Sequence, residues 1–201
     1  YIGDWSSDVC SSDLIFVTPQ GYRGEGVFDN FWSLVEKWKA SFITIVPTAA
    51  AELMQRPINA DVSSLRYALC GSAPLPQDLF KKFEASTGIK ILEGYGMTEA
   101  TCLVSGNPVD GGIRKIGSVG IPFPYTKVKI AKDGSDLKKI KTCKVDEIGE
   151  VCVANPGVIP GQTYTDIKKN EDLFYETDFL RTGDLGYLDA RSEEHTSELQ
   201  S

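Results

Sequence analysis

The sequence predicts an α/β fold in which a parallel βαβ part is followed by a small antiparallel, barrel-like β part. The first part is predicted because apolar residues recur at helical spacing and short apolar runs of strand length lie between the helical segments. The second part is predicted because the chain alternates apolar and polar residues from about residue 118 onward. We therefore expect two structural segments, residues 15–115 and 116–190.

The first helix is predicted over residues 27–39, because large apolar side chains recur there at helical spacing. They are Phe28, Phe31, Trp32, Val35 and Trp38. Residues 41–48 predict a short buried strand that ends at Pro47, because proline cannot donate to a strand ladder. Residues 48–55 predict a second helix, with Thr48 as its N-cap.

A second strand, a third helix and a third strand follow in the same order. Residues 64–73 predict a strand that runs into a loop of small residues. The next helix is predicted to have Pro76 in its first turn and Gly88 as its C-cap, because proline favours helix starts and glycine favours helix ends. Residues 89–96 predict the third strand. Strands separated by helices of this length imply parallel βαβ units.

Residues 116–190 are predicted to form antiparallel β structure. Two stretches alternate apolar and polar residues, TKVKIA from Thr126 and GEVCVA from Gly149. Turn sequences follow them at Asp133-Gly134 and Pro156-Gly157. No amphipathic helix is predicted in this segment.

Both ends of the chain carry polar sequence with no apolar period. The stretches Asp4–Leu14 and Arg191–Ser201 resemble translated sequencing adapter, because one adapter string encodes the second stretch and its reverse complement encodes the first. We therefore expect residues 1–14 and 191–201 to be adapter-derived and exclude them from the predicted fold. The alternative is a pair of natural acidic, serine-rich tails.

This exclusion changes the composition that bears on function. Removing six acidic residues and one arginine takes the formal net charge from −7 to −2, so the charge indicates neither a nucleic-acid partner nor a membrane surface. The only histidine, His195, is also removed, which excludes a histidine-based mechanism within residues 15–190. No apolar run approaches membrane-spanning length, and nothing in the sequence supports peripheral membrane contact.

The remaining cysteines match neither a CxxC metal site nor a compact disulfide framework. They are Cys70, Cys102, Cys143 and Cys152. We expect them to be reduced, mostly buried thiols of a cytoplasmic protein.

The strongest chemical signal is the segment Leu92–Thr101, LEGYGMTEAT, at the end of the third predicted strand. Glycines let the backbone approach a ligand closely, and ligands of open α/β sheets bind beyond the carboxyl ends of strands. Tyr95 offers a flat face to a base, Thr98 a hydroxyl to a phosphate, and Glu99 a hard oxygen to Mg²⁺. We predict Thr98 and Glu99 as catalytic and Glu99 as the metal ligand. The predicted cofactor-binding residues of this segment are Glu93, Gly94, Tyr95, Gly96, Met97 and Thr98.

Two further segments add candidate ligand contacts. Leu180–Ala190 contains Asp184 between two glycine-containing turns, where a carboxylate can accept hydrogen bonds from both hydroxyls of a ribose. Tyr67–Pro76 contains a small-residue loop, whose predicted cofactor-binding residues are Gly71, Ser72, Ala73 and Pro74. Each segment alone is also compatible with an ordinary turn, so the prediction depends on the set and its order.

Together these segments resemble the adenylate-forming (AMP-binding) superfamily of acyl-CoA synthetases, luciferases and peptide-synthetase adenylation domains. The form Gly-Tyr-Gly-Met-Thr-Glu is more similar to acyl- and aryl-CoA synthetases, and the motifs cover nearly all of residues 60–190 in the family's order. The resemblance implies a partial N-terminal domain of an adenylate-forming enzyme. It further implies that Tyr95 stacks on adenine, that Asp184 binds the ribose, and that residues 71–74 line the adenine and carboxylate pocket.

The function implied by the resemblance is an ATP-dependent acid–thiol ligase. Such an enzyme activates a carboxylic acid, here a fatty or aryl acid, as acyl-AMP and transfers the acyl group to CoA. ATP, Mg²⁺ and CoA would be required, with Thr98 at the phosphate and Glu99 at the metal. Two alternatives stay open: an adenylation domain that loads a carrier protein, and a non-catalytic nucleotide-binding domain of the same fold.

Several parts of the family's pattern are not found in this sequence. They are the Ser/Thr/Gly-rich phosphate loop, the hinge and the C-terminal lysine, and Lys168 and Lys169 lie among polar residues where solvation is expected. Nucleotidyl chemistry depends strongly on neutralising phosphate charge. We therefore expect an internal fragment that is inactive by itself.

Overall fold

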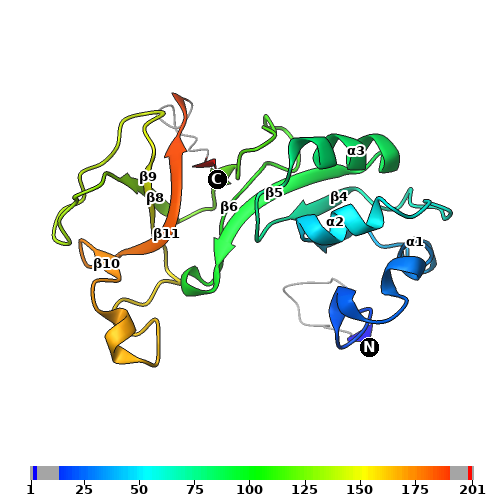
Figure 1. The fold of residues 1–201 in the computed structure, drawn as a ribbon, viewed down its shortest axis with the longest axis horizontal. Coiled ribbons are helices and arrows are strands. Elements are labelled where there is room, and N and C mark those ends of the chain that lie inside the picture. Colours follow the sequence, from blue (N-terminus) through cyan, green and yellow to red (C-terminus); the bar gives the residue numbers. More distant parts are fainter. Residues whose placement is uncertain (1, 4–13, 191–198, 201) are drawn as a thin grey trace.

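The computed structural model describes residues 2–3, 14–190 and 199–200. These residues form two five-stranded sheets and a two-stranded ribbon, with strand orders β3-β4-β5-β6-β7, then β8-β9-β11-β10 with β12 paired to β11, and β1-β2. In Figure 1 helices α1, α2 and α3 lie on the right and strands β8 to β11 on the left. His195 and nearly all of the adapter-like sequence lie outside the described residues.

The first sheet begins with three parallel strands, as the sequence predicts. They are β3 (Phe42–Ile45), β4 (Tyr67–Cys70) and β5 (Lys90–Met97). Ile43 pairs with Ala68, which in turn pairs with Ile91, so the register is unbroken across the three strands. The helices are α1 (Val27–Trp38), which precedes β3, and the two crossovers α2 (Pro47–Leu53) and α3 (Gln77–Thr87).

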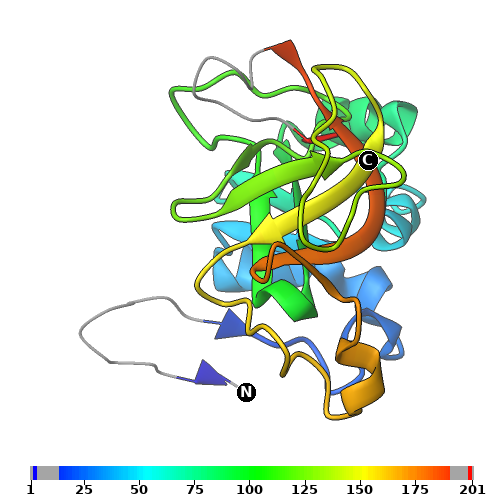
Figure 2. The same ribbon diagram turned by 90° about the vertical axis from the view of Figure 1, so that its left-hand side faces the viewer.

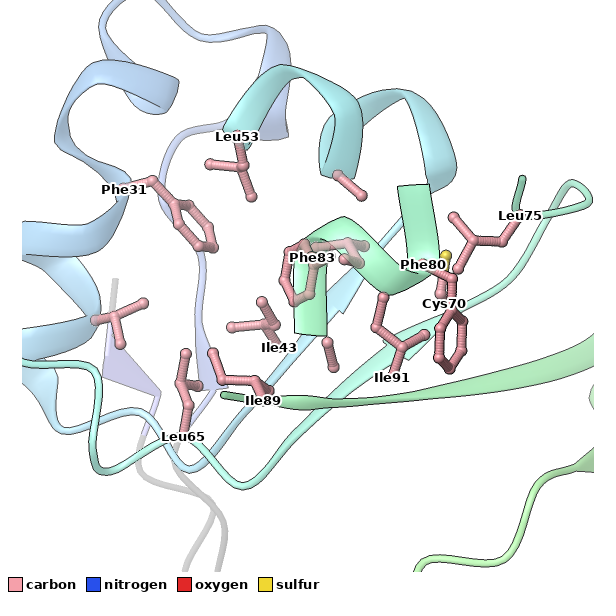
Figure 3. Packing of buried hydrophobic residues seen from close by; sticks show 14 of the residues in the cluster. Phe31, Ile43, Leu53, Leu65, Cys70, Leu75, Phe80, Phe83, Ile89 and Ile91 are labelled. Atoms are coloured by element: carbon pink, nitrogen blue, oxygen red, sulfur yellow. The ribbon is translucent and has the colours of Figure 1, made fainter. Parts of the chain in front are cut away.

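The three helices and the parallel strands share one apolar core. Alternate residues of β3 point into it, because Ile43 and Ile45 are buried while Phe42 is 51% exposed. Figure 3 shows Phe31 of α1, Leu53 of α2 and Phe83 of α3 gathered near the strands. Full burial of each large apolar side chain contributes about 1.5–3 kcal/mol, so this core anchors the first half of the molecule.

The helix ends follow local sequence, with two corrections at helix starts. Helix α2 begins at Pro47 and has Val46 as its N-cap, so the prediction of Thr48 as N-cap is wrong. The fixed φ of proline suits the first helical position, which moves the helix start upstream. Pro76 is predicted in the first turn of α3 but is its N-cap, one residue earlier, whereas Gly88 is the left-handed C-cap at φ 71°, as predicted.

Strand β5 changes partner along its length. Its first half pairs with β4 in parallel, whereas Gly94–Met97 pairs antiparallel with β6 (Cys102–Gly106). Strand β6 then pairs with β7 (Ile121–Pro122), and neither of these two strands is predicted from the sequence. A Cβ on Gly96 would lie 1.7 Å from the carbonyl oxygen of Cys102, so only glycine fits where the two strands meet.

The second sheet is antiparallel, as predicted. Its strands are β8 (Lys127–Ala131), β9 (Gly149–Ala154), β10 (Phe174–Tyr175) and β11 (Phe179–Leu188). Figure 2 shows this sheet curled, with β11 bent along its length. The pairing of β11 with β9 shifts register between Arg181 and Leu185, so residues 182–184 bulge out of the ladder.

The remaining elements are short. They are β1 (Ile2–Gly3), β2 (Leu14–Ile15), β12 (Leu199–Gln200) and the 3₁₀ turns η1 (Gly21–Arg23), η2 (Thr98–Ala100) and η3 (Ile167–Asn170). Across the described part of the chain, no helix combines the length and apolarity needed to cross a bilayer.

Candidate functional site

The two strongest sequence motifs meet in space. Tyr95 lies on the second half of β5, and Asp184 lies in the bulge of β11. The phenol Oη of Tyr95 donates a hydrogen bond to Oδ2 of Asp184 at 2.5 Å, across 89 residues of sequence. Burial first, and then this hydrogen bond, raise the pKa of Tyr95 far above its ordinary value, so the phenol stays protonated and acts as the donor.

A cleft of about 350 Å³ opens beside this contact. Its walls come from both sheets and from the small-residue loop after β4. The lining residues are Ser72, Ala73, Pro74, Gly94, Tyr95, Gly96, Val119, Val151, Asp184 and Leu185. Seven of these ten are predicted cofactor-binding residues; the other three, Val119, Val151 and Leu185, are apolar wall residues.

The small-residue loop can sit against β5 because it lacks bulk. A Cβ on Gly71 would lie 3.2 Å from the carbonyl oxygen of Gly94, closer than ordinary packing allows. Ser72 follows at φ 68°, a left-handed conformation that turns the chain sharply after the strand. Ser72, Ala73 and Pro74 are therefore exposed at the cleft instead of continuing β4.

Two other predicted binding residues, Glu93 and Met97, do not line the cleft. Glu93 is only 8% exposed, and its Oε2 accepts a hydrogen bond from the backbone N–H of Gly117 at 2.8 Å. Burial raises the pKa of Glu93 above its ordinary value. Met97 packs against an apolar cluster that joins Val104 of β6 to Val151 of β9.

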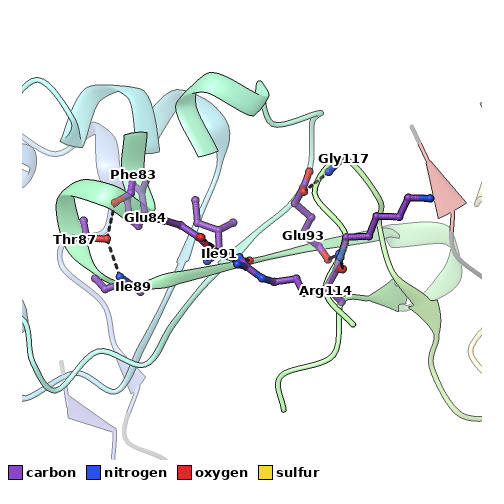
Figure 4. A network of polar contacts seen from close by, with 10 residues as sticks. Phe83, Glu84, Thr87, Ile89, Ile91, Glu93, Arg114 and Gly117 are labelled. Carbon is purple, nitrogen blue, oxygen red and sulfur yellow. Dashed lines mark hydrogen bonds and ion pairs between the residues drawn. The ribbon is translucent and has the colours of Figure 1, made fainter. Parts of the chain in front are cut away.

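The loop held by Glu93 is anchored a second time by Arg114. The guanidinium of Arg114 forms an ion pair with Glu84 of α3 and donates to the carbonyl oxygen of Ile91 at 2.8 Å. Figure 4 shows this network reaching from α3 along β5 to Glu93 and Gly117. These contacts fix the loop that ends at Val119, one wall of the cleft.

Thr98 and Glu99 lie on η2, directly after β5, beside the cleft lining and not within it. Thr98 is exposed. Oε1 of Glu99 accepts a hydrogen bond from the phenol of Tyr164 at 2.5 Å. That bond, followed by one from the backbone N–H of Glu99, lowers the pKa of Glu99, so its carboxylate is ionised at neutral pH.

Tyr164 is the site neighbour that sequence reasoning missed. It lies between β9 and η3, in a stretch with neither helical nor strand periodicity. Its position beside Glu99 follows only from the tertiary fold, because 65 residues separate the two.

Turn η2 offers one carboxylate, Glu99, as a metal ligand. Among the described residues no group of three or more His, Cys, Asp or Glu side chains could hold a metal ion. Mg²⁺ is commonly held by one or two carboxylates together with substrate phosphates. An ionised Glu99 beside a cleft fits that arrangement.

Comparisons with known proteins identify the family of the chain. Residues 16–162 match the family model of the AMP-binding enzymes. The chain is 40% identical over 180 residues to the marinolic acid–CoA ligase of Pseudoalteromonas sp. (strain SANK 73390), covering 89% of this chain and 27% of that protein. It is 33% identical over 158 residues to the long-chain-fatty-acid–CoA ligase of Bacillus subtilis (strain 168), covering 78% of this chain and 27% of that protein.

Solved structures give the same result. ATP-bound MatB from Rhodopseudomonas palustris matches with a TM-score of 0.73 at 30% identity, over 86% of this chain and 32% of that one. The O-succinylbenzoate–CoA synthetase of Bacillus subtilis, in complex with ATP and magnesium, matches with a TM-score of 0.69 at 28% identity, over 86% and 33%. The chain thus spans a third or less of these relatives. It belongs to the AMP-binding enzyme family, in the adenylate-forming superfamily and of the acyl-CoA synthetase type.

Proposed function

We propose that the intact protein is an AMP-forming acid–CoA ligase and that this chain carries its adenosine-binding cleft. The observation that carries the proposal is the meeting of Tyr95 and Asp184 at one cleft of about 350 Å³. Small-molecule sites are clefts of roughly 300–1,000 Å³ with a few well-placed polar groups. The CoA-ligase names of the relatives support the same reaction class.

The cleft residues suit the parts of an adenosine. The ring of Tyr95 supplies a flat face for the base. Asp184 would accept hydrogen bonds from the two ribose hydroxyls, in place of the bond that it accepts from Tyr95 in this structure. Ser72, Ala73 and Pro74 add little bulk, which leaves room beside the ring.

The proposed reaction has two steps. First, a carboxylate oxygen of the acid attacks the α-phosphorus of ATP; an O–P bond forms and the bond to pyrophosphate breaks. Second, the sulfur of the deprotonated CoA thiol attacks the acyl carbonyl carbon; a thioester forms and AMP leaves with the bonding electron pair. Thr98 is proposed to donate its hydroxyl to a phosphate oxygen, because it is exposed immediately after the strand that carries Tyr95.

Glu99 is the residue proposed to hold Mg²⁺. Its carboxylate is ionised and lies next to Thr98 on η2. When bound, Mg²⁺ would neutralise part of the phosphate charge. Lys168 and Lys169 are exposed, in keeping with solvated side chains.

The substrate is proposed to be a fatty or aryl acid. Two relatives are named for marinolic acid and for long-chain fatty acids, and others for 4-coumarate.

A cytoplasmic location is part of the proposal, and it is supported by four described cysteines that are all free thiols. We also propose that the chain alone is inactive, that residues 15–115 and 116–190 are its structural segments, and that residues 1–14 and 191–201 are adapter-derived.

The test is acid-dependent exchange of pyrophosphate into ATP by the intact protein, with a panel of fatty and aromatic acids. We expect exchange with at least one acid and thioester formation when CoA is added. Exchange followed by transfer only to a carrier protein would favour the carrier-loading alternative. Nucleotide binding without exchange for any acid would contradict the ligase and favour a non-catalytic domain.

A further inference from the structure

The segment of residues 155–170, between β9 and the end of η3, contacts the turn that follows β5 at three points. Asn155 Nδ2 donates to the carbonyl oxygen of Ala100 at 3.3 Å. Thr101 Oγ1 donates to the carbonyl oxygen of Gly157 at 2.7 Å. The third contact is the Tyr164–Glu99 hydrogen bond described above. Each of the residues from 99 to 101 is thus bonded to the 155–170 segment.

The 155–170 segment is itself held by side-chain amides. Asn170 accepts a hydrogen bond from the backbone N–H of Tyr164 at 2.9 Å and donates to its carbonyl oxygen at 2.8 Å. Both backbone groups of Tyr164 are therefore satisfied by one side chain. At the other end, Asn155 Oδ1 accepts from the N–H of Gly157 at 2.8 Å. These hydrogen bonds hold the backbone of the loop on both sides of Tyr164, so the position of its phenol is fixed by the loop.

The 155–170 segment and the turn after β5 lie so close together at Gly157 that no side chain fits there. A Cβ at this position would lie 2.5 Å from Oγ1 of Thr101, so glycine is needed for the contact. Tyr164 is partly buried at the other end of the same interface. The Glu99 carboxylate is therefore held by a donor from the segment after β9, although its own backbone belongs to η2, directly after β5.

We propose that Tyr164 is a positioning residue that orients the carboxylate of Glu99 toward Mg²⁺ held with the nucleotide phosphates. This inference rests on the proposed function, in which Glu99 is the metal ligand. A carboxylate that accepts one directed hydrogen bond loses rotational freedom, and outer-shell partners of this kind tune the affinity of the metal ligand. The phenol touches neither substrate nor metal in this role, and it acts only through Glu99.

The test compares Tyr164→Phe with Tyr125→Phe in the intact protein. Both variants remove one phenol oxygen, but Tyr125 is 87% exposed and has no part in the proposal. Mn²⁺ serves as the metal probe, and its binding is measured by electron paramagnetic resonance with α,β-methylene-ATP, which cannot transfer its adenylyl group because its α,β bridge is not cleaved. We expect Tyr164→Phe to weaken Mn²⁺ binding by about tenfold, as for other outer-shell partners, and Tyr125→Phe to leave it unchanged.

A kinetic readout separates positioning from general damage. Tyr164→Phe should raise the Mg²⁺ concentration needed for half-maximal pyrophosphate exchange while leaving the KM for the acid unchanged. Asn170→Ala keeps the phenol but loosens its backbone, so it should show a smaller loss of Mn²⁺ affinity in the same direction. It also provides the test if Tyr164→Phe fails to fold.

Two outcomes overturn the inference. Unchanged Mn²⁺ affinity in folded Tyr164→Phe would make the contact merely structural, and tighter binding would make the phenol a competitor of the metal. Failure of the proposed function looks different, because the wild-type protein would then bind Mn²⁺ with the nucleotide analogue and yet show no exchange with any acid.

Discussion

The parallel half of the molecule and the cleft differ in the regularity of their backbone. Strands β3, β4 and β5 keep an unbroken register beneath three helices. In contrast, the segments that line the cleft leave regular pairing: Ser72 has positive φ, and register shifts occur between Tyr95 and Gly96 and again before Leu185. Irregular backbone re-aims side chains toward a ligand, whereas regular pairing supplies stability. Stability and ligand binding should therefore respond to different substitutions.

The largest stability effect is expected in the parallel half. Phe83→Ala removes a fully buried ring of α3 and should lower the free energy of unfolding by about 3–5 kcal/mol. Urea denaturation of the chain measures this. Phe42→Ala, in a side chain that is 51% exposed on β3, is the matched control and should cost less than about 1 kcal/mol. Equal losses for the two variants would break the distinction between the buried and the open side of the sheet.

The next largest loss of stability is expected where β5 and β6 meet. Gly96→Ala forces a Cβ against the carbonyl oxygen of Cys102, so it should cost about 1–3 kcal/mol and also abolish AMP binding by the intact protein. Gly134→Ala is the control for backbone strain alone, since Gly134 has φ 71° but nothing within 4 Å of an added Cβ. That variant should lose about 1–2 kcal/mol and bind AMP normally. Normal AMP binding by Gly96→Ala would separate the junction from the cleft.

These contrasts show what the sequence could predict and what it could not. The helices around Phe31 and Phe83 and the three parallel strands follow from apolar periodicity, and the structure confirms them. The sequence does not predict strand β6, because the chain enters it through Thr101 and Cys102 at positive φ, at 56° and 80°, and no glycine or proline marks this turn.

The site shows the same division. The cleft residues 72–74, Tyr95 and Asp184 could be predicted because their motifs stand in the order of a known family. The partners of the glutamates could not, because Glu93 bonds to Gly117 and Glu99 to Tyr164, across 24 and 65 residues. Such long-range contacts leave no periodic trace in a single sequence.

The smallest change in stability is expected at Glu93, which lies on β5 and also holds the loop beside the cleft through Gly117. Its pKa is raised by burial above the ordinary value of 4.5, so the folded state binds the proton more tightly than the unfolded state does. The corresponding stability is fully present below pH 4.5 and is lost as the pH rises through the folded pKa. Glu93→Gln, which can still accept from Gly117, should therefore unfold at higher urea concentration than wild type at pH 7.

The control for this prediction is the same comparison of Glu93→Gln with wild type at low pH. The advantage of Glu93→Gln at pH 7 should disappear below pH 4.5, where the wild-type side chain is protonated in both states. A Glu93→Gln variant that is less stable than wild type at pH 7 would instead show that the ionised carboxylate stabilises the loop through Gly117.

The central claim, that Tyr95 and Asp184 form an adenosine site, is tested most directly by AMP binding to the intact protein, measured by isothermal titration calorimetry. Asp184→Ala removes charge-assisted hydrogen bonds to the ribose, each worth about 1.5–3 kcal/mol, so affinity should fall by about tenfold or more. Asp178→Ala, at an exposed aspartate one residue before β11, should bind AMP like the wild type. An Asp184→Ala variant that binds AMP as tightly as Asp178→Ala does would contradict the claim.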